Sequence, residues 1–304
     1  MNDSQEKEWN EKHFINPSAT DNGKYVYYGL YPQTNVNDAM LVQKLNTLAP
    51  TDYNGYVCHN HEYYIKKTAD LAYNGHGEMV MVHDFNNGNE IVDGSNYWFK
   101  VEPIMWRILS NNLGEKLLLS DTVIERIVFN HHDYKTEVIN GITVYGNYYS
   151  NSNARRWLND DFIDIAFAFN QSPIQTTLVD NSASTIPFPI DGWACENTLD
   201  KVFPLSFKDY TNPEYGFSEK REASSTRHFL TTDYARTVGV LYQDELYKEQ
   251  EYYTAYCITR SPLAYEGDEN TTDNICKVNK EGLLNIVGYS GTSLGVQPAM
   301  NIKI

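Results

Sequence analysis

The sequence has few cysteines and no long apolar run. Among its 304 residues the only cysteines are Cys58, Cys195, Cys257 and Cys276, and no two of them form a Cys-x-x-Cys pair. This usage is too sparse for a disulfide scaffold, although one bridge between Cys257 and Cys276 stays open. No apolar stretch reaches the roughly 20 residues that a membrane-spanning helix needs, so we expect no membrane span. The first residues are polar, and no secretory signal peptide is visible.

Positive charge is scarce as well. Lys and Arg number 24 against 40 Asp and Glu, which gives a formal net charge of −16. Such a chain repels phosphate backbones and anionic lipids on average, so we expect no nucleic-acid partner. The sequence also lacks Gly-x-Ser-x-Gly, a phosphate loop, a dinucleotide fingerprint and His-Glu-x-x-His. Several common enzyme classes therefore have no signature here.

Tyrosine and turn-forming dipeptides are what the sequence has in abundance. There are 24 tyrosines, and Asn-Gly or Asp-Gly pairs recur at residues 54, 74, 87 and 93. The central feature is a hairpin of two strands, at 97–110 and 117–121, with turn residues at 111–114. Pro103 cannot donate to a strand ladder, so it marks a bend, a bulge or an edge position. A second hairpin is predicted over 55–67, with its turn near Asn60. Short strands separated by such turns indicate antiparallel β structure.

Three short helices are predicted from apolar spacing and capping residues. The first covers 38–48, with Asn37 or Asp38 as its cap. The second covers 150–169, with Ser152 or Asn153 as its cap and a break near 159–161, and the third covers 232–238. A strand at 252–259 is expected to end in a break at 260–262. The predicted fold class is α+β, with a mostly antiparallel β core; residues 1–23 form a polar tail and 24–304 a single domain.

Several segments together resemble a known bacterial family. The set covers roughly residues 24–304, and its specificity comes from the combination, not from any one motif. The segments are Tyr28-Gly29-Leu30-Tyr31-Pro32-Gln33, residues 97–110 and 117–121, Ala154-Arg155-Arg156-Trp157-Leu158-Asn159, Lys201-Val202-Phe203-Pro204-Leu205-Ser206, Thr232-Asp233-Tyr234-Ala235, Thr259-Arg260-Ser261-Pro262 and Gly295-Val296-Gln297-Pro298-Ala299. This pattern resembles the family called domain of unknown function 6273.

The resemblance implies a fold similar to C-type-lectin-like domains, including the formylglycine-generating, sulfatase-modifying type. It also implies a secreted or surface context, and no known activity. Two positions depart from the family pattern: Cys257-Ile258-Thr259 replaces the usual tryptophans before Arg-Ser-Pro, and Gln297 replaces an arginine. If that arginine holds an internal ion pair, its partner must be satisfied in another way here.

Metal and redox chemistry have only weak signals. Cys58, His59, His61, His76 and His83 are close enough in sequence for a zinc site, but ordinary strand positions are favoured because Cys58 and His59 point to opposite faces. His131-His132-Asp133 is read as a solvated loop. Asp268, Asn270 and Asp273 offer oxygen atoms to calcium, yet no lectin calcium motif accompanies them. A copper oxidase would need two cysteines close together, and Cys257 and Cys276 are its only candidates. We therefore expect no metal and no cofactor.

The sequence favours a non-catalytic binding domain. Tyr, Asn and Asp combine contact area with adaptable hydrogen bonds, and they crowd the closing loops. The expected contact residues are Tyr265, Asp268, Asn270, Asp273 and Tyr289, and the expected partner is a protein or a glycan. A copper-dependent oxidase of the formylglycine-generating type and a purely structural surface module are the alternatives. The expected location is extracellular or at the cell surface with a leader removed, or else the cytoplasm; the oligomeric state stays open.

Overall fold

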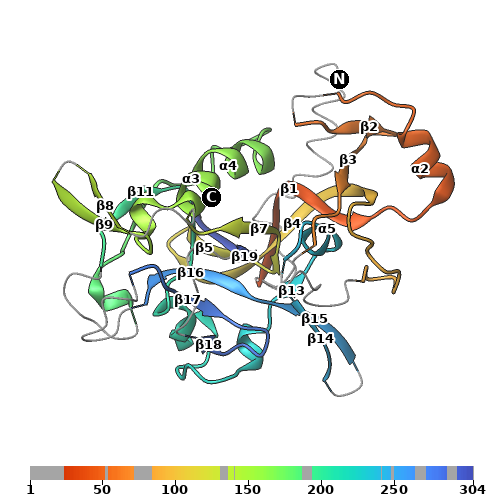
Figure 1. The fold of residues 1–304 in the computed structure, drawn as a ribbon. Helices are drawn as coiled ribbons and strands as arrows, with labels where there is room; N and C mark the ends of the chain where they lie inside the picture. Colours follow the sequence, from red (N-terminus) through yellow and green to blue (C-terminus); the bar gives the residue numbers. More distant parts are fainter. Residues whose placement is uncertain are drawn as a thin grey trace.

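Many short strands and a few short helices make up the structure, a computed structural model of the chain (Figure 1). It describes residues 24–51, 54–71, 84–130, 136–139, 141–186, 194–240, 242–247, 250–263, 272–285 and 293–303. The helices are α2 (Ala39–Leu45), α3 (Asn153–Asn159), α4 (Asp161–Ala166) and α5 (Asp233–Thr237). The strands are β1 (Tyr25–Asn35), β2 (Val57–His59), β3 (Glu62–Thr68), β4 (Asn96–Asn112), β5 (Glu115–Ser120), β6 (Thr122–Val123), β7 (Glu125–Val128), β8 (Thr136–Ile139), β9 (Ile142–Tyr145), β10 (Thr177–Val179), β11 (Thr198–Asp200), β12 (Val202–Pro204), β13 (Leu230–Thr231), β14 (Tyr242–Tyr247), β15 (Gln250–Ala255), β16 (Cys257–Pro262), β17 (Ile275–Val278), β18 (Leu284–Asn285), β19 (Ser293–Val296) and β20 (Pro298–Lys303).

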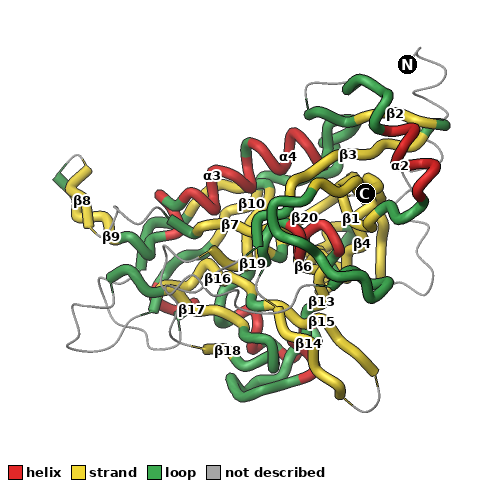
Figure 2. The backbone as a smooth tube through the Cα atoms, turned by 45° about the vertical axis from the view of Figure 1, so that its right-hand side comes forward, coloured by secondary structure: helices red, strands yellow, loops and turns green. Residues whose placement is uncertain are grey.

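The strands form mostly antiparallel sheets, which confirms the predicted α+β class. The largest has seven strands in the order β12-β20-β5-β4-β3-β2, with β1 paired to β4. A five-stranded sheet, β18-β17-β16-β19-β7, and a four-stranded sheet, β14-β15-β13-β6, lie beside it. Only the β13–β6 and β16–β19 pairs run parallel among the described strands. The hairpins β8–β9 and β14–β15 project at the periphery in both views, whereas α3 and α4 run in line across the sheets (Figures 1 and 2).

Strand β4 is paired on both edges and forms the spine of the largest sheet. β1 takes one edge, whereas β3 and β5 share the other. On this edge the pairing with β3 extends to Lys100 and the pairing with β5 begins at Trp106, which lies opposite Ser120, so the stretch around Pro103 has no strand partner there. Because proline cannot donate to a ladder, this gap is where the strand tolerates it. The predicted interruption is therefore confined to one edge, and β4 continues through it.

The helix caps and the second hairpin follow the prediction. Asp38 accepts backbone N–H bonds at the start of α2, Ser152 does so for α3, and Thr232 for α5. The second predicted helix divides at Asp160 into α3 and α4. The turn between β2 and β3 places Asn60 at φ 52°. These features are local, so nearby residues suffice to specify them.

The break predicted at 260–262 is wrong. β15 ends at Ala255, and β16 runs through Arg260 to Pro262. The pairing of β16 with β17 shifts register between Ile258 and Pro262, which is a bulge in β16. Within this bulge the Arg260 N–H donates to the Leu205 carbonyl at 3.1 Å. The backbone of Arg260, which leaves the β17 register, is therefore paired with a distant segment, and β16 continues to Pro262, which lies opposite Ile275.

One hydrophobic cluster joins residues from Val26 to Ile302, with Trp106 wholly buried within it. The Trp106 Nε1–H donates to the Tyr28 carbonyl at 2.7 Å. The single domain at 24–304 stays a prediction, and residues 1–23 lie outside the described part. Among the described residues no helix has the length and apolar character of a membrane span.

The buried side chain of Arg227 stabilises a region that has few strand pairings. Arg227 has no exposed surface, and its guanidinium donates to five backbone carbonyls. Those carbonyls belong to Tyr210, Ser218, Lys220, Glu222 and Gly282, at 2.6–3.1 Å. Burial lowers the pKa of Arg227 from its ordinary value. One side chain thus satisfies carbonyls that loops would otherwise leave unpaired inside the protein.

Gly29 creates a bulge in β1 at the tightest contact with α4. Its φ is +70°, and the β1–β4 register shifts between Tyr27 and Leu30. A Cβ at this position would lie 2.5 Å from a ring carbon of Phe167 and 2.9 Å from the Ala166 carbonyl oxygen. A side chain here would therefore meet both backbone strain and a steric clash.

We expect Gly29→Ala to lower the free energy of unfolding by about 2–4 kcal/mol, because strain and overpacking add. Gly216→Ala is the matched control, since Gly216 has φ +80° and open space around its Cβ position. This control should cost only about 1 kcal/mol, the strain alone. Urea denaturation measures both, and equal losses in the two variants would contradict the packing argument.

Candidate functional site

Of the predicted contact residues, the structure describes only Asp273. Asp273 is 6% exposed, so it lies inside the turn before β17 and not on its outer surface. Tyr265, Asp268, Asn270 and Tyr289 lie outside the described residues. The proposed contact surface in the closing loops therefore stays a prediction.

The two cysteines of the oxidase alternative are buried strand residues. Cys257 and Cys276 have no exposed surface, and all four cysteines are free, so the suggested bridge is not formed. Burial raises the pKa of Cys257 to about 12 and that of Cys276 further. The thiolate is the form that reacts and binds metal. Neutral thiols in the core support a packing role for this pair.

Only part of the histidine-rich stretch lies among the described residues. Cys58 and His59 lie on β2 opposite Tyr63 and Glu62, as ordinary members of a hairpin. His76, His83 and the His131-His132-Asp133 segment lie outside the described residues. In the described part of the chain no three His, Cys, Asp or Glu side chains come together as metal ligands.

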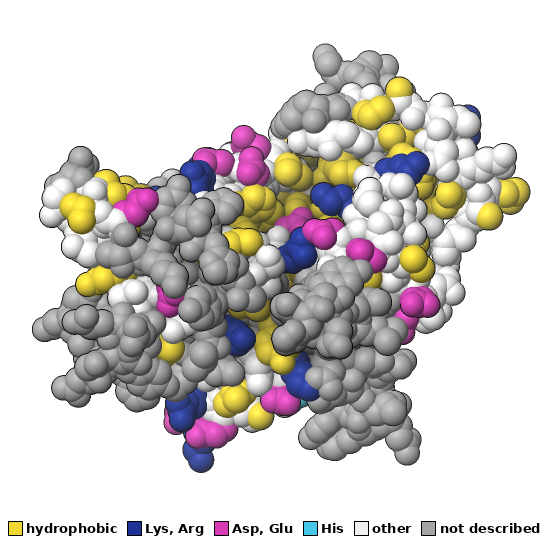
Figure 3. Space-filling model, in the orientation of Figure 1, with side chains coloured by type: hydrophobic (Ala, Val, Ile, Leu, Met, Phe, Trp, Pro, Cys, Tyr) yellow, Lys and Arg dark blue, Asp and Glu magenta, His cyan; other side chains and the backbone are white. Residues whose placement is uncertain are grey.

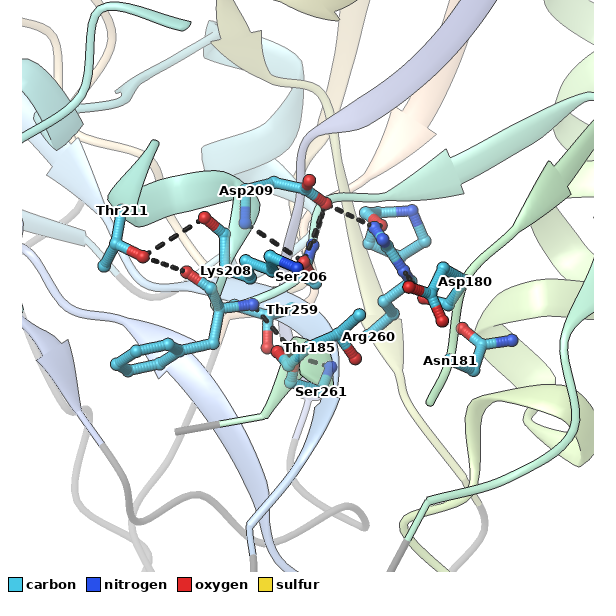
Figure 4. A network of polar contacts seen from close by, with 12 residues as sticks. Asp180, Asn181, Thr185, Ser206, Lys208, Asp209, Thr211, Thr259, Arg260 and Ser261 are labelled. Carbon is cyan, nitrogen blue, oxygen red and sulfur yellow. Dashed lines mark hydrogen bonds and ion pairs between the residues drawn. The ribbon is translucent and has the colours of Figure 1, made fainter. Parts of the chain in front are cut away.

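The Thr-Arg-Ser stretch of β16 forms a buried polar network (Figure 4). The Arg260 guanidinium pairs with Asp209 at 2.8 Å and donates to the carbonyls of Pro204, at 2.9 Å, and Asp180, at 3.3 Å. The Ser261 hydroxyl donates to the Thr185 carbonyl at 2.9 Å. These bonds attach two loops, around residues 180–185 and 204–209, to β16. This segment of the family pattern therefore has a structural role, since it holds two loops against β16.

Gln297 is satisfied without the arginine of the family pattern. It is 1% exposed and lies between β19 and β20. Its Nε2 donates to the Ser120 carbonyl at 2.7 Å, and the Tyr210 hydroxyl donates to its Oε1 at 3.0 Å. The neutral amide of Gln297 thus joins Ser120 of β5 to Tyr210.

A cavity of about 190 Å³ lies beneath the β8–β9 hairpin. Its lining comes from the hairpin, from the end of the β7 segment and from the start of α3. The lining residues are Asn130, Glu137, Ile139, Val144, Tyr145, Asn151, Asn153 and Arg156. Glu137 pairs with Val144 in the hairpin, and Ile139 pairs with Ile142. Since side chains alternate between the faces of a strand, Glu137, Ile139 and Val144 share the face that covers the cavity.

One of the polar side chains that line this cavity has a hydrogen-bond donor without a described acceptor. The Nδ2 of Asn153 is buried and finds no acceptor among the described residues. Its Oδ1 accepts a hydrogen bond from the Arg156 guanidinium, which holds the amide in place. Glu137, Asn151 and Arg156 are exposed, so the cavity reaches the surface. A buried N–H without a partner is costly, and a ligand oxygen would satisfy it.

Sequence reasoning missed this cavity. The weak signal was the Ile-Asn-Gly-Ile sequence at 139–142, since Asn-Gly marks a hairpin turn. The helix with Asn153 and Arg156 was predicted, but nothing in the sequence places that helix under the hairpin. Only the tertiary fold brings the hairpin and the helix together.

We expect Arg260→Met to lower the free energy of unfolding by about 2–4 kcal/mol, because two carbonyls lose a donor and Asp209 loses its ion-pair partner. Lys303→Met is the control, since Lys303 and Glu115 form a pair in which both side chains are 60% exposed. That control should change stability by less than about 0.5 kcal/mol. Urea denaturation of the two variants measures these losses from the shift in midpoint, provided that the dependence of the unfolding free energy on urea is unchanged. A stability loss in the control as large as that in Arg260→Met would contradict the structural role of Arg260.

Comparison with known proteins gives a single family. No curated protein matches the chain, and no solved structure matches it. A family model matches residues 113–304, which is more than half of the chain and includes the cavity and the Arg260 network. The match begins in the turn after β4, later than the resemblance at residues 24–304 suggested. The chain belongs to the family described as Domain of unknown function (DUF6273).

Proposed function

We propose that the chain is a non-catalytic binding domain whose cavity beneath the β8–β9 hairpin takes one sugar of a glycan. The observation that carries this proposal is the donor of Asn153, buried in a cavity lined largely by planar polar side chains. Amides, a carboxylate and a guanidinium can each hold two neighbouring hydroxyls, and Tyr145 offers a ring for an apolar sugar face. The C-type-lectin-like resemblance of the family and an extracellular or surface location belong to the same proposal.

The size of the cavity supports a single sugar. Cavities for drug-sized ligands measure about 300–1,000 Å³, whereas this one measures about 190 Å³. It therefore admits one ring-sized group, with the rest of a chain outside. The net charge of −16 disfavours a strongly anionic glycan, so a neutral sugar is the better candidate.

A protein partner is the second candidate, favoured by an exposed apolar side chain on the hairpin. Val138 is 71% exposed. Val138 pairs with Thr143 and so lies on the face turned away from Glu137. A protein that packs on this outer face would depend on Val138, whereas a sugar in the cavity would not.

A glycan array with the full chain tests the proposal. We expect binding to a restricted set of neutral glycans, and Asn153→Ala and Arg156→Ala should each weaken it by roughly 5- to 100-fold, the effect of one lost hydrogen-bonding group. Asn111→Ala, at an exposed asparagine outside the cavity lining, is the matched control and should not change binding.

Two results would contradict the proposal. An array without any bound glycan would refute the ligand class, and glycan binding that survives both cavity variants would refute the site. Loss of partner binding in Val138→Ser alone would instead favour the protein candidate.

A further inference from the structure

The cavity beneath the β8–β9 hairpin has a polar outer part and a more apolar inner part. Its exposed lining residues include Glu137, Asn151 and Arg156. Figure 3 shows hydrophobic and acidic side chains together at the end of the molecule that carries this hairpin. The less exposed part of the lining includes Val144 and Tyr145, which pack against the main hydrophobic cluster. A ligand that fits this cavity therefore has a polar side toward the opening and an apolar group toward the interior.

The inner part also contains the donor of Asn153. Its Nδ2 is buried and has no acceptor among the described residues, and its Oδ1 accepts a hydrogen bond from the Arg156 guanidinium. Because a guanidinium only donates, this bond fixes which end of the Asn153 amide is the donor. The cavity therefore needs an acceptor oxygen at one defined position.

Three kinds of ligand oxygen accept hydrogen bonds, and they differ in what else they bring into the cavity. A hydroxyl oxygen brings a hydrogen that needs an acceptor of its own, and a carboxylate brings a charge that is costly to bury. A carbonyl oxygen is neutral and only accepts. A methyl group attached to that carbonyl would contact the apolar side chain of Val144. An acetyl group thus combines the acceptor that Asn153 lacks with the apolar surface that the inner lining favours.

Glu137 favours an amide over an ester as the carrier of this acetyl group. The Glu137 carboxylate forms no hydrogen bond or ion pair with another described residue, although Arg156 lines the same cavity. An amide presents an N–H donor and a C=O acceptor on opposite sides. Its carbonyl can accept from Asn153 while its N–H donates to Glu137. An ester has no N–H and would leave the carboxylate without a donor.

We infer that the sugar bound beneath the hairpin is an N-acetylated hexosamine, an inference that rests on the proposed glycan site. The acetamido carbonyl accepts from the Asn153 Nδ2, the acetamido N–H donates to Glu137, and the methyl group packs against Val144. The ring hydroxyls lie toward the opening, near Asn151 and Arg156. Such a sugar is neutral, as the net charge of −16 favours.

Calorimetry with the full chain tests this inference. N-acetylglucosamine and N-acetylgalactosamine are compared with glucose and galactose, which carry a hydroxyl in place of the acetamido group. We expect at least one acetamido sugar to bind with a Kd near ~1 mM. It should bind at least about tenfold more tightly than its parent sugar, the effect of one carbonyl hydrogen bond and one buried methyl group. N-methylacetamide, which has the amide without the ring, should bind at least about tenfold more weakly than that acetamido sugar.

Asn153→Asp removes the donor and keeps the shape of the side chain. Asn153 is the first residue of α3, where a negative charge suits the helix, and an aspartate would still accept from Arg156, so the variant should fold. Its second carboxylate oxygen would repel the acetamido carbonyl, and the preference for the acetamido sugar should be lost. Asn111→Asp is the matched control, because it adds the same charge at an exposed asparagine outside the lining and should keep the preference.

A second variant guards against a loss of folding. If Asn153→Asp is not folded by circular dichroism, Val144→Thr serves, because threonine keeps the branched shape that suits a strand and places a hydroxyl against the acetamido methyl. This variant should weaken the preference for the acetamido sugar severalfold.

The results distinguish this inference from the proposed function on which it rests. Equal binding of acetamido and parent sugars, or array hits that all lack an acetamido group, would overturn the inference and leave the glycan site in place. A preference that survives in folded Asn153→Asp, or N-methylacetamide binding as tight as that of the sugar, would also overturn it. An array without any bound glycan, together with no binding of the four sugars, would refute the glycan site and the inference together.

Discussion

The need to pair buried backbone carbonyls governs much of this structure. Its strands are short, and long connections between them pass through the interior, where water cannot satisfy peptide groups. Arg227 donates hydrogen bonds to five backbone carbonyls, and Arg260 of β16 donates to the carbonyls of Asp180 and Pro204. The planar guanidinium suits this task because it carries five donors and no acceptor. Such arginines replace the ladder bonds that longer strands would have supplied.

Features that depend on neighbouring residues were predicted from the sequence, whereas contacts between distant residues were not. The cap at Asp38, the turn at Asn60 and the split of the second helix depend on residues within one turn, and these predictions were confirmed. The break at 260–262 was wrong because the partner of Arg260 is the Leu205 carbonyl, far away in sequence. Tyr31 and Glu125 are 94 positions apart, and no local pattern links them. The cavity is missed for the same reason, since its hairpin and its helix are joined only by the tertiary fold.

Two kinds of buried polar group therefore coexist. Arg227, Arg260 and Gln297 reach partners within the chain, so their hydrogen bonds stabilise the fold and leave little for a ligand. The Nδ2 of Asn153, in contrast, lacks an acceptor among the described residues. Polar groups that a fold positions but does not neutralise are costly to keep. Such groups mark the places where binding a ligand relieves a cost already present in the free protein.

The charges in the lining of the cavity beneath the β8–β9 hairpin bear on the ligand proposed for it. Glu137 and Arg156 carry opposite charges and leave the lining nearly balanced. A balanced lining gives little electrostatic preference for an ion, so the proposed ligand is a neutral molecule rich in hydroxyls. Selectivity for such a ligand would depend on hydrogen-bond geometry, because the amide, carboxylate and guanidinium groups of the lining offer donors and acceptors in fixed directions.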